Sequence, residues 1–300
     1  MLFSQCTILV LAPVPDNLPL PGTTFAALPD HALVSLVGAD ASTFAQAQFA
    51  NDVSALADGH WHWNTWLTPK GRVIAVFALV KLAADDLLLI VPDYRVQRLC
   101  AELSRFVFRR KVLITHRVDL QAGAALQSPF AARGAEICHA ENAIELDYSG
   151  EGGLRALCIA SDLPLASDDI VAEWRSLDLR HGLARLAAEQ SEQWTPQQLS
   201  LDRLHAYSVR KGCYPGQEIV ARTHFLGKTK RELALFQSAI ALEQGAQVSA
   251  GDRVVGSVVS TSGCLSLAVL PVERGPEPLD AGGLALTELP LLPGLARGAL

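Results

Sequence analysis

The octapeptide KGCYPGQE, at residues 211–218, constrains the local backbone more than any other stretch of this 300-residue chain. Gly212 and Gly216 permit positive φ angles or a close approach of the backbone to a ligand, and Pro215 fixes the chain between them. Residues 217–225 predict a short helix. Cys213 therefore lies just before a helix N-terminus, and the motif forms a tight loop between two helices.

This loop has the composition of a reactive-cysteine site. The free N–H groups and the positive dipole end of a helix favour a thiolate at Cys213. Lys211 would favour the thiolate further if the loop folds its ammonium toward the sulfur. The alternative interpretation is a packed loop cysteine beside a turn. The combination of neighbours favours the reactive thiol.

The charge distribution is uneven. Half of the residues are hydrophobic and 19% are charged, which is typical of a globular protein, and the net charge of −6 argues against a general nucleic-acid binder. We interpret one cluster of basic residues as a solvated helix face: Arg95, Arg98, Arg105, Arg109, Arg110, Lys111 and Arg117. A second cluster surrounds the octapeptide, as an anionic ligand requires: Arg203, Arg210, Lys211, Arg222, Lys228, Lys230 and Arg231.

The six cysteines lie far apart, with no C-x-x-C pair and no histidine at ligand spacing. That spacing predicts no protein-built zinc or iron–sulfur site, and hence no stably bound metal. Cysteines of this kind fit a reducing cytosol. No apolar run is long enough to span a bilayer, so we expect a cytoplasmic protein without a membrane partner.

Hydrophobic periodicity predicts an α+β protein. Helices are expected at residues 40–49, 93–109, 168–181, 195–209 and 217–225. Strands are expected at residues 33–38, 61–66, 72–80, 87–91, 111–115 and 154–160, and residues 121–153 carry no clear pattern. Short strands at 232–237, 253–261 and 265–270 predict a small β-barrel or sandwich, followed by a loose tail over part of residues 271–300.

Taken with these elements, the octapeptide resembles the signature of the YgfZ family of folate-binding proteins, which are relatives of the glycine-cleavage T-protein. Further blocks that resemble the family follow in the right order: Gly38-x-Asp40-Ala41-x-x-Phe44, Gln48, Asn51-Asp52-Val53, Lys70-Gly71-Arg72-Val73, Arg180-x-Gly182, Pro196-Gln197, and Gly256 with Ser260. The resemblance covers roughly residues 30–270. The octapeptide is its most specific part.

The resemblance implies a three-domain, T-protein-like ring around a channel that binds tetrahydrofolate or a one-carbon derivative. Two domains are α+β. The first is interleaved, with residues 1–56 joined to 121–228, and the second spans residues 57–120. Residues 229–300 form a C-terminal β-barrel and tail.

By the same resemblance, Cys213 is the key thiol and Lys211 its catalytic companion. The residues expected to bind the folate are Tyr214, Gly216, Gln217, Glu218, Arg222 and Lys228. A pterin ring needs aromatic or apolar walls, and its glutamate tail needs cations. Five aromatic residues are candidates for those walls: Trp61, Trp63, Trp66, Tyr214 and Phe225.

The implied function is folate-dependent support of the assembly or repair of iron–sulfur enzymes, including some that modify tRNA. Those client enzymes are the expected partners, with no direct contact to nucleic acid and with the protein a monomer or weak dimer. An aminomethyltransferase or demethylase is an alternative, but no carboxylate follows Lys70-Gly71 to act as its acid or base. A second alternative is a folate-binding scaffold without chemistry.

Overall fold

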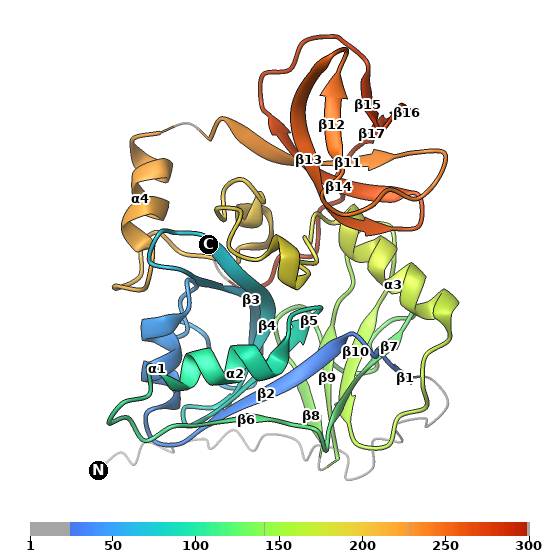
Figure 1. Ribbon diagram of the computed structural model, residues 1–300. Coiled ribbons are helices and arrows are strands. Elements are labelled where there is room, and N and C mark those ends of the chain that lie inside the picture. Colours follow the sequence, from blue (N-terminus) through green and yellow to red (C-terminus); the bar gives the residue numbers. More distant parts are fainter. Residues whose placement is uncertain (1–24, 141, 228, 299–300) are drawn as a thin grey trace, which may run out of the picture.

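The computed structural model describes residues 25–140, 142–227 and 229–298. Within those ranges the chain forms two five-stranded sheets, a seven-stranded sheet and four α-helices (Figure 1). The expected α+β class is confirmed. In Figure 1 the seven-stranded sheet lies above α3 and the two smaller sheets below it.

The first sheet is antiparallel throughout and has the order β3-β4-β5-β2-β6. Its strands, in that order, are His60–Leu67, Val73–Ala83, Asp86–Pro92, His31–Val37 and Leu113–His116. Helices α1 (Ala41–Gln48) and α2 (Val96–Ser104) bury apolar side chains in the same core cluster as this sheet. Burial of this apolar surface away from water stabilises the packing of the helices on the sheet.

The second sheet has the order β1-β7-β10-β9-β8 and is also antiparallel. Its strands, in that order, are Ala26–Ala27, Gln121–Ala125, Ala156–Ala160, Ala143–Asp147 and Cys138–Ala140. Three of them fall in the stretch without a clear sequence pattern. The expected helix at 168–181 is confirmed as α3 (Asp168–Arg180), with Ser167 as its N-cap.

The chain is interleaved between these two sheets, but the crossover differs from the expected domain border. Strand β1 belongs to the second sheet, the chain passes to the first sheet at His31, and it returns to the second at Gln121. Residues 31–56 were expected in the domain with 121–228. Strand β2 instead lies between β5 and β6 and bonds to both, which fixes it in the first sheet.

The expected C-terminal barrel is confirmed as a nearly closed seven-stranded sheet of order β16-β15-β12-β13-β14-β11-β17. In chain order its strands are β11 (Arg231–Gln237), β12 (Gln247–Ala250), β13 (Arg253–Ser262), β14 (Leu265–Pro271), β15 (Leu279–Ala281), β16 (Leu284–Ala285) and β17 (Thr287–Leu289). Residues 290–298 then return to the smaller sheets, where Trp63 Nε1 donates to Leu295 O at 2.8 Å. This part of the expected tail is packed.

The helix expected at residues 195–209 is wrong. Its capping box does form, because Thr195 N donates to Gln198 Oε1 at 3.0 Å and Gln198 N to Thr195 Oγ1 at 3.3 Å. The chain then makes turns and a short 3-10 helix, Leu201–Leu204, bounded by Ser200 and His205 in the left-handed region. A cap therefore predicted where a helix could start but not how far it would run.

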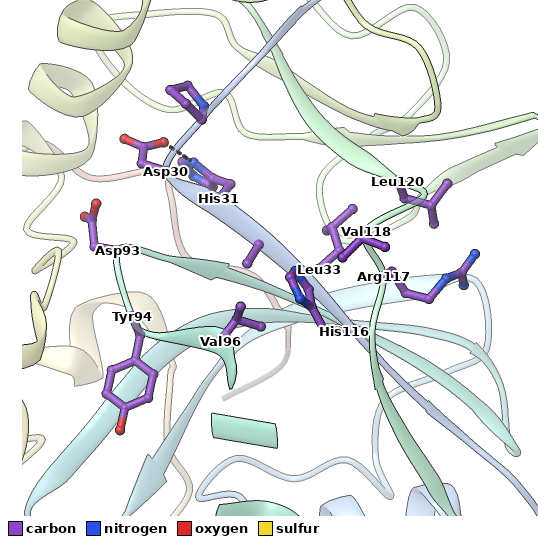
Figure 2. Close-up of a pocket in the computed structure, with 12 residues that line it drawn as sticks. Asp30, His31, Leu33, Asp93, Tyr94, Val96, His116, Arg117, Val118 and Leu120 are labelled. Atoms are coloured by element: carbon purple, nitrogen blue, oxygen red, sulfur yellow. Dashed lines mark hydrogen bonds and ion pairs between the residues drawn. The ribbon is translucent and has the colours of Figure 1, made fainter. Parts of the chain in front are cut away.

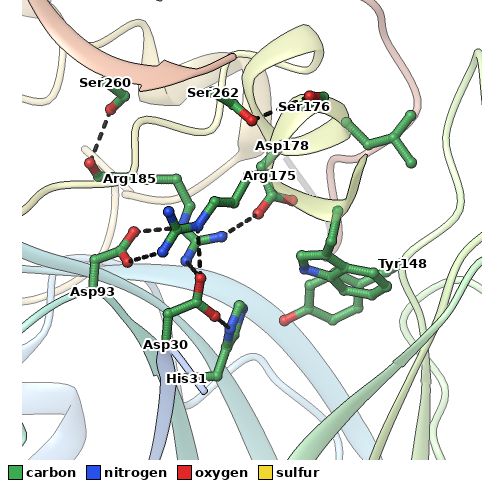
Figure 3. Close-up of polar contacts among 12 residues, drawn as sticks. Asp30, His31, Asp93, Tyr148, Arg175, Ser176, Asp178, Arg185, Ser260 and Ser262 are labelled. Carbon is green, nitrogen blue, oxygen red and sulfur yellow. Dashed lines mark hydrogen bonds and ion pairs between the residues drawn. The ribbon is translucent and has the colours of Figure 1, made fainter. Parts of the chain in front are cut away.

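A buried network of charges joins the three sheets through α3 (Figure 3). Asp178, on α3, accepts from Arg155 at 2.7 Å and from Arg185 at 3.2 Å. Arg185 also pairs with Asp30 at 2.8 Å and with Asp93 at 2.6 Å. The expected helix at residues 93–109 would start at Asp93. That helix instead begins after Arg95, and Asp93 lies in the network.

Candidate functional site

Lys211 joins the octapeptide to the C-terminal end of α1. Its Nζ donates to the carbonyl oxygens of Gln46 and Phe49, each at 2.6 Å, and of Asn51 at 3.0 Å. The last carbonyls of a helix lack partners within the helix and lie at its negative end. Burial lowers the pKa of Lys211 to about 8. The side chain therefore keeps its proton at neutral pH and can donate to all three carbonyls.

The structure places Lys211 and Cys213 in different surroundings. The Lys211 side chain is buried under α1, whereas Cys213 is exposed on the loop. No hydrogen bond joins Lys211 Nζ to Cys213 Sγ, both of which the structure describes. A catalytic partnership between the two stays a prediction. The role that the contacts support for Lys211 is to hold the loop in place.

The octapeptide loop is also held by its own polar side chains. Tyr214 is buried and its hydroxyl donates to Ser208 O at 3.0 Å. Gln217 Nε2 donates to Lys211 O at 2.8 Å. Both residues were expected to bind folate, and these contacts give them a part in closing the loop that contains Cys213.

Gly216 permits a close contact between the loop and the β3–β4 turn. Its φ of +80° lies in the left-handed region, and a Cβ on it would lie 2.7 Å from Gly71 Cα. Such a contact excludes any side chain at this position. Helix α4 (Gln217–Phe225) begins at the next residue, as expected, and carries Glu218 and Arg222 on its exposed surface. Lys228 lies outside the described residues.

Asn51 connects the loop region to β3. Its Nδ2 donates to Trp63 O at 2.8 Å and to His205 O at 2.6 Å, and its backbone carbonyl accepts from Lys211. Backbone groups far apart in the sequence thus meet at one buried amide. Asn51 belongs to the N-terminal block that resembles the YgfZ family. Its hydrogen bonds give this block a structural role, because they connect it to β3 and to the octapeptide.

Next to Asn51, His62 lies in a fully buried polar pocket. Its Nδ1 lies 3.3 Å from Asn51 Nδ2, and its Nε2 lies 3.1 Å from Asn64 Nδ2. Burial, and to a lesser extent the Lys211 ammonium, lowers the pKa of His62 to about 3. A protonated ring would present N–H groups to two amide N–H donors, so the neutral form is strongly preferred.

We expect this buried histidine to weaken the fold in acid. The unfolded chain binds a proton at the ordinary histidine pKa near 6.5, while the folded chain does so only near 3. Between these values the unfolded state holds more protons, so stability falls as the pH drops below about 6.5. At about 1.4 kcal/mol per pH unit, the loss reaches about 3 kcal/mol by pH 4. Urea unfolding of wild type and His62→Gln from pH 7 to pH 4 measures it, and parallel curves for the two proteins would contradict the account.

A cavity of about 360 Å³ lies beside the loop. It is lined by Asn51, Asp52, Ala55, Asp202, His205, Tyr207, Ser208, Val209, Arg210 and His224. The lining comes from the segment after α1, from the chain just before Lys211, and from α4 just after the octapeptide. The walls combine two carboxylates, an arginine, two histidines and a tyrosine ring, which is a mixture that suits a polar aromatic ligand.

The predicted folate residues and this cavity do not coincide. Tyr214, Gly216 and Gln217 form the adjacent loop, and their assignment to folate stays a prediction, as it does for Glu218 and Arg222. The cavity residues that sequence reasoning did not assign are Asp52, Asp202, His205, Tyr207 and His224. Their position in the sequence was the available signal: Asp52 lies in the N-terminal block, and the other four lie within nine residues of the octapeptide.

The tryptophans expected as walls of a ligand pocket are core residues. Trp61, Trp63 and Trp66 are all buried, and Trp61 stacks on Tyr148 with ring centroids 4.8 Å apart. Both faces of β3 are covered, because every residue of the strand after His60 is buried. Of the five aromatic candidates only Phe225 is exposed.

A larger cavity, of about 580 Å³, lies away from the octapeptide at the ends of β2, β5 and β6 (Figure 2). Its charged lining is internally paired. Asp30 and Asp93 belong to the buried arginine network, and Arg117 binds Asp119 at 2.6 Å. With those charges neutralised, the cavity offers little to a charged ligand.

Across the described ranges, no helix reaches the length and apolarity that a bilayer crossing requires. Within the same ranges, no group of three or more His, Cys, Asp or Glu side chains is arranged to hold a metal ion.

Comparison with known proteins identifies the family. No protein-family model matches the chain. A tRNA-modifying protein YgfZ of Klebsiella pneumoniae, however, is 31% identical over 231 residues, which cover 70% of each chain. The chain belongs to the YgfZ family. A second YgfZ protein, from Colwellia psychrerythraea, is 28% identical over 255 residues, or 78% of each chain.

This YgfZ family member has the fold of the T-protein. The glycine cleavage system aminomethyltransferase T of Bartonella henselae superposes with a TM-score of 0.69 over 89% of this chain and 84% of the other, at 15% identity. The T-protein-like fold implied by the sequence is therefore confirmed.

Proposed function

We propose that this YgfZ family member binds tetrahydrofolate, or a one-carbon derivative, and supports the assembly or repair of iron–sulfur enzymes, including enzymes that modify tRNA. The observation that carries the proposal is the cavity beside the octapeptide. Its lining flanks the loop on both sides, with Arg210 directly before Lys211 and His224 on α4 after it. A ligand in that cavity would lie next to the segment that holds Cys213.

The chemistry of the cavity fits a folate. Its volume of about 360 Å³ lies in the range of small-molecule sites. Ala55, Tyr207 and Val209 provide an apolar and aromatic wall for a pterin ring. The carboxylates of Asp52 and Asp202 can accept from the N–H groups of that ring, and Arg210 can bind a glutamate carboxylate. When bound, the folate would supply a carrier for one-carbon groups.

Cys213 supplies the proposed thiol. It is exposed on a loop that Lys211 and Tyr214 hold in place, so the sulfur is accessible to a partner protein while its backbone is fixed. One cysteine cannot hold an iron–sulfur cluster alone. The thiol would therefore act on a cluster or a cysteine that the client enzyme presents.

We expect Cys213→Ser to separate thiol chemistry from folate binding. The hydroxyl keeps the size of the side chain but cannot supply a thiolate, so support of an iron–sulfur enzyme should fall about tenfold or more. Affinity for 5-formyltetrahydrofolate should stay unchanged, because Cys213 does not line the cavity. The matched control is Cys264→Ser, which removes an exposed cysteine of the barrel. Full iron–sulfur support by the Cys213→Ser protein would refute the role of the thiol and favour a folate-binding scaffold.

A further inference from the structure

The segment between α2 and β6 forms an exposed basic and aromatic surface. Helix α2 ends at Ser104, and Arg105 and the residues after it lie in consecutive turns. The expectation that these basic residues lie on a helix face is therefore wrong for this segment. Residues 105–111 read RFVFRRK and contain four cations, two phenylalanines and no carboxylate. We call residues 105–113 the basic–aromatic loop.

The cations of this loop have no acidic partners among residues 25–140, 142–227 and 229–298. Arg105, Arg109, Arg110 and Lys111 are exposed, and none of their head groups forms an ion pair or hydrogen bond with a residue in the described part of the chain. This contrasts with the other arginines of the same sequence cluster, which are paired: Arg95, Arg98 and Arg117. Four unpaired positive charges on a protein of net charge −6 indicate an anionic partner.

Phe108 lies between Arg105 and Arg109 in the sequence and is exposed. Its side chain is 88% exposed, and its φ of +48° lies in the left-handed region, which a phenylalanine rarely adopts. The guanidinium of Arg109 lies 5.5 Å from the ring centroid, at cation–π distance. A large apolar side chain that is exposed and has a strained backbone does not stabilise the folded chain. Strained residues of this kind cluster at binding sites.

The loop is fixed at its base. Lys111 N donates to Asp40 Oδ2 at 2.7 Å, and Asp40 N donates to Lys111 O at 3.1 Å. Gly38 allows this approach, since a Cβ there would overlap Lys111 O. Leu113 then pairs with Val37 in the first sheet, and both side chains are exposed. The surface is preorganised, which lowers the entropy that binding would cost.

We propose that the basic–aromatic loop binds an unpaired strand of nucleic acid. Such a strand offers phosphates for the four cations and flat bases to stack on the free face of Phe108. An acidic protein surface would satisfy the cations but would leave the exposed ring without a planar partner. An anionic membrane is typically bound by a longer amphipathic helix, which residues 105–113 do not form.

This inference goes beyond the proposed function and does not depend on it. The cavity beside the octapeptide contains no residue of the basic–aromatic loop. The net charge of −6 still argues against a general nucleic-acid binder, and a local site on this loop replaces the expectation of no direct contact with nucleic acid. A local site in an acidic protein predicts weak binding that salt suppresses strongly.

The test is fluorescence anisotropy of the full-length protein with labelled oligouridine and oligothymidine of about 15 nucleotides, a length suited to one binding groove. We expect saturable binding, with a slope of log K against log salt of about −3 if all four cations contact phosphates. Phe108→Ala should weaken binding about tenfold without changing the slope. The Arg109→Ala/Arg110→Ala variant should reduce the slope by about 1.4. A preference for oligouridine would identify RNA as the ligand.

The matched controls are Arg253→Ala and Phe130→Ala, which remove an exposed arginine and an exposed phenylalanine elsewhere. Both should bind as wild type does, and none of the loop variants should change folate affinity. The proposal is overturned if neither oligonucleotide binds saturably, or if Phe108→Ala binds as tightly as wild type. It is also overturned if polyglutamate or anionic phospholipid vesicles, and not oligonucleotides, bind in a way that depends on Phe108.

Discussion

Replacing Asp178 with asparagine should lower the free energy of unfolding by about 3–5 kcal/mol, because it leaves two buried guanidinium groups without their shared carboxylate. Arg155, Asp178 and Arg185 are all almost fully buried, and Asp178 pairs with both arginines; Figure 3 shows its pairing with Arg185. Asparagine keeps the volume of the side chain but not the charge. Two like charges would then face each other where water cannot screen them.

Urea unfolding of Asp178→Asn, with Asp169→Asn as the control, measures this effect. Asp169 lies on the same helix but is exposed, so its substitution should cost less than about 1 kcal/mol. If Asp178→Asn lowered the free energy of unfolding no more than the control does, the expected electrostatic contribution of Asp178 to stability would be contradicted. The barrel contacts the same segment, since Ser260 Oγ donates to the backbone carbonyl of Arg185 at 2.9 Å.

Lys211→Met should lower the free energy of unfolding by about 3 kcal/mol, because three carbonyls lose a charged donor within the protein. Methionine retains much of the length of the side chain but provides no hydrogen bond to Gln46, Phe49 or Asn51. The exposed Lys230→Met is the control and should have little effect. Because Asn51 lines the cavity, folate affinity should fall as well.

This prediction also separates two roles for Lys211. A lysine that acts only as the catalytic companion of Cys213 could be replaced with little change in stability, while iron–sulfur support would be lost. A lysine that anchors the loop must affect stability and folate affinity together. Unchanged unfolding of Lys211→Met would contradict the anchoring role.

Local patterns in the sequence predicted local structure well. The apolar runs of β2, β5, β10 and β14 were long and β-branched or leucine-rich, and the helix of residues 168–181 had a clear apolar face and a C-terminal glycine. The octapeptide correctly placed a tight loop before α4. These features depend on neighbouring residues, which a sequence pattern records.

Features that depend on distant contacts were not predictable in the same way. The α-helix expected from Thr195 does not form, and the backbone carbonyls of His205 and Ala206 accept hydrogen bonds from Asn51 and Thr65. Lys211 was assigned a chemical role because of the family resemblance and because Cys213 lies two residues later, whereas its observed partners lie 160 to 165 residues earlier in the sequence. Trp61, Trp63 and Trp66 were expected as walls of a ligand pocket, whereas both faces of β3 are buried in the core.

The cavity beside the octapeptide was also not predictable from local sequence patterns. The N-terminal block includes Asp52 and the basic cluster around the octapeptide includes Arg210, but only the fold brings these residues together with His224. The unpaired state of the cations in the basic–aromatic loop also required the structure, because the sequence places paired and unpaired arginines in one cluster.

The most direct test of the proposed function is a calorimetric titration of wild type, Ala55→Trp and Ala57→Trp with 5-formyltetrahydrofolate. Ala55 is exposed and lines the cavity beside the octapeptide, so a tryptophan there should fill much of it. Ala57 is a nearby exposed alanine that does not line this cavity. We predict saturable binding by wild type and Ala57→Trp, and affinity at least about tenfold weaker for Ala55→Trp. Equal affinity in all three proteins would place the folate elsewhere, and the absence of binding in wild type would contradict the account of the cavity altogether.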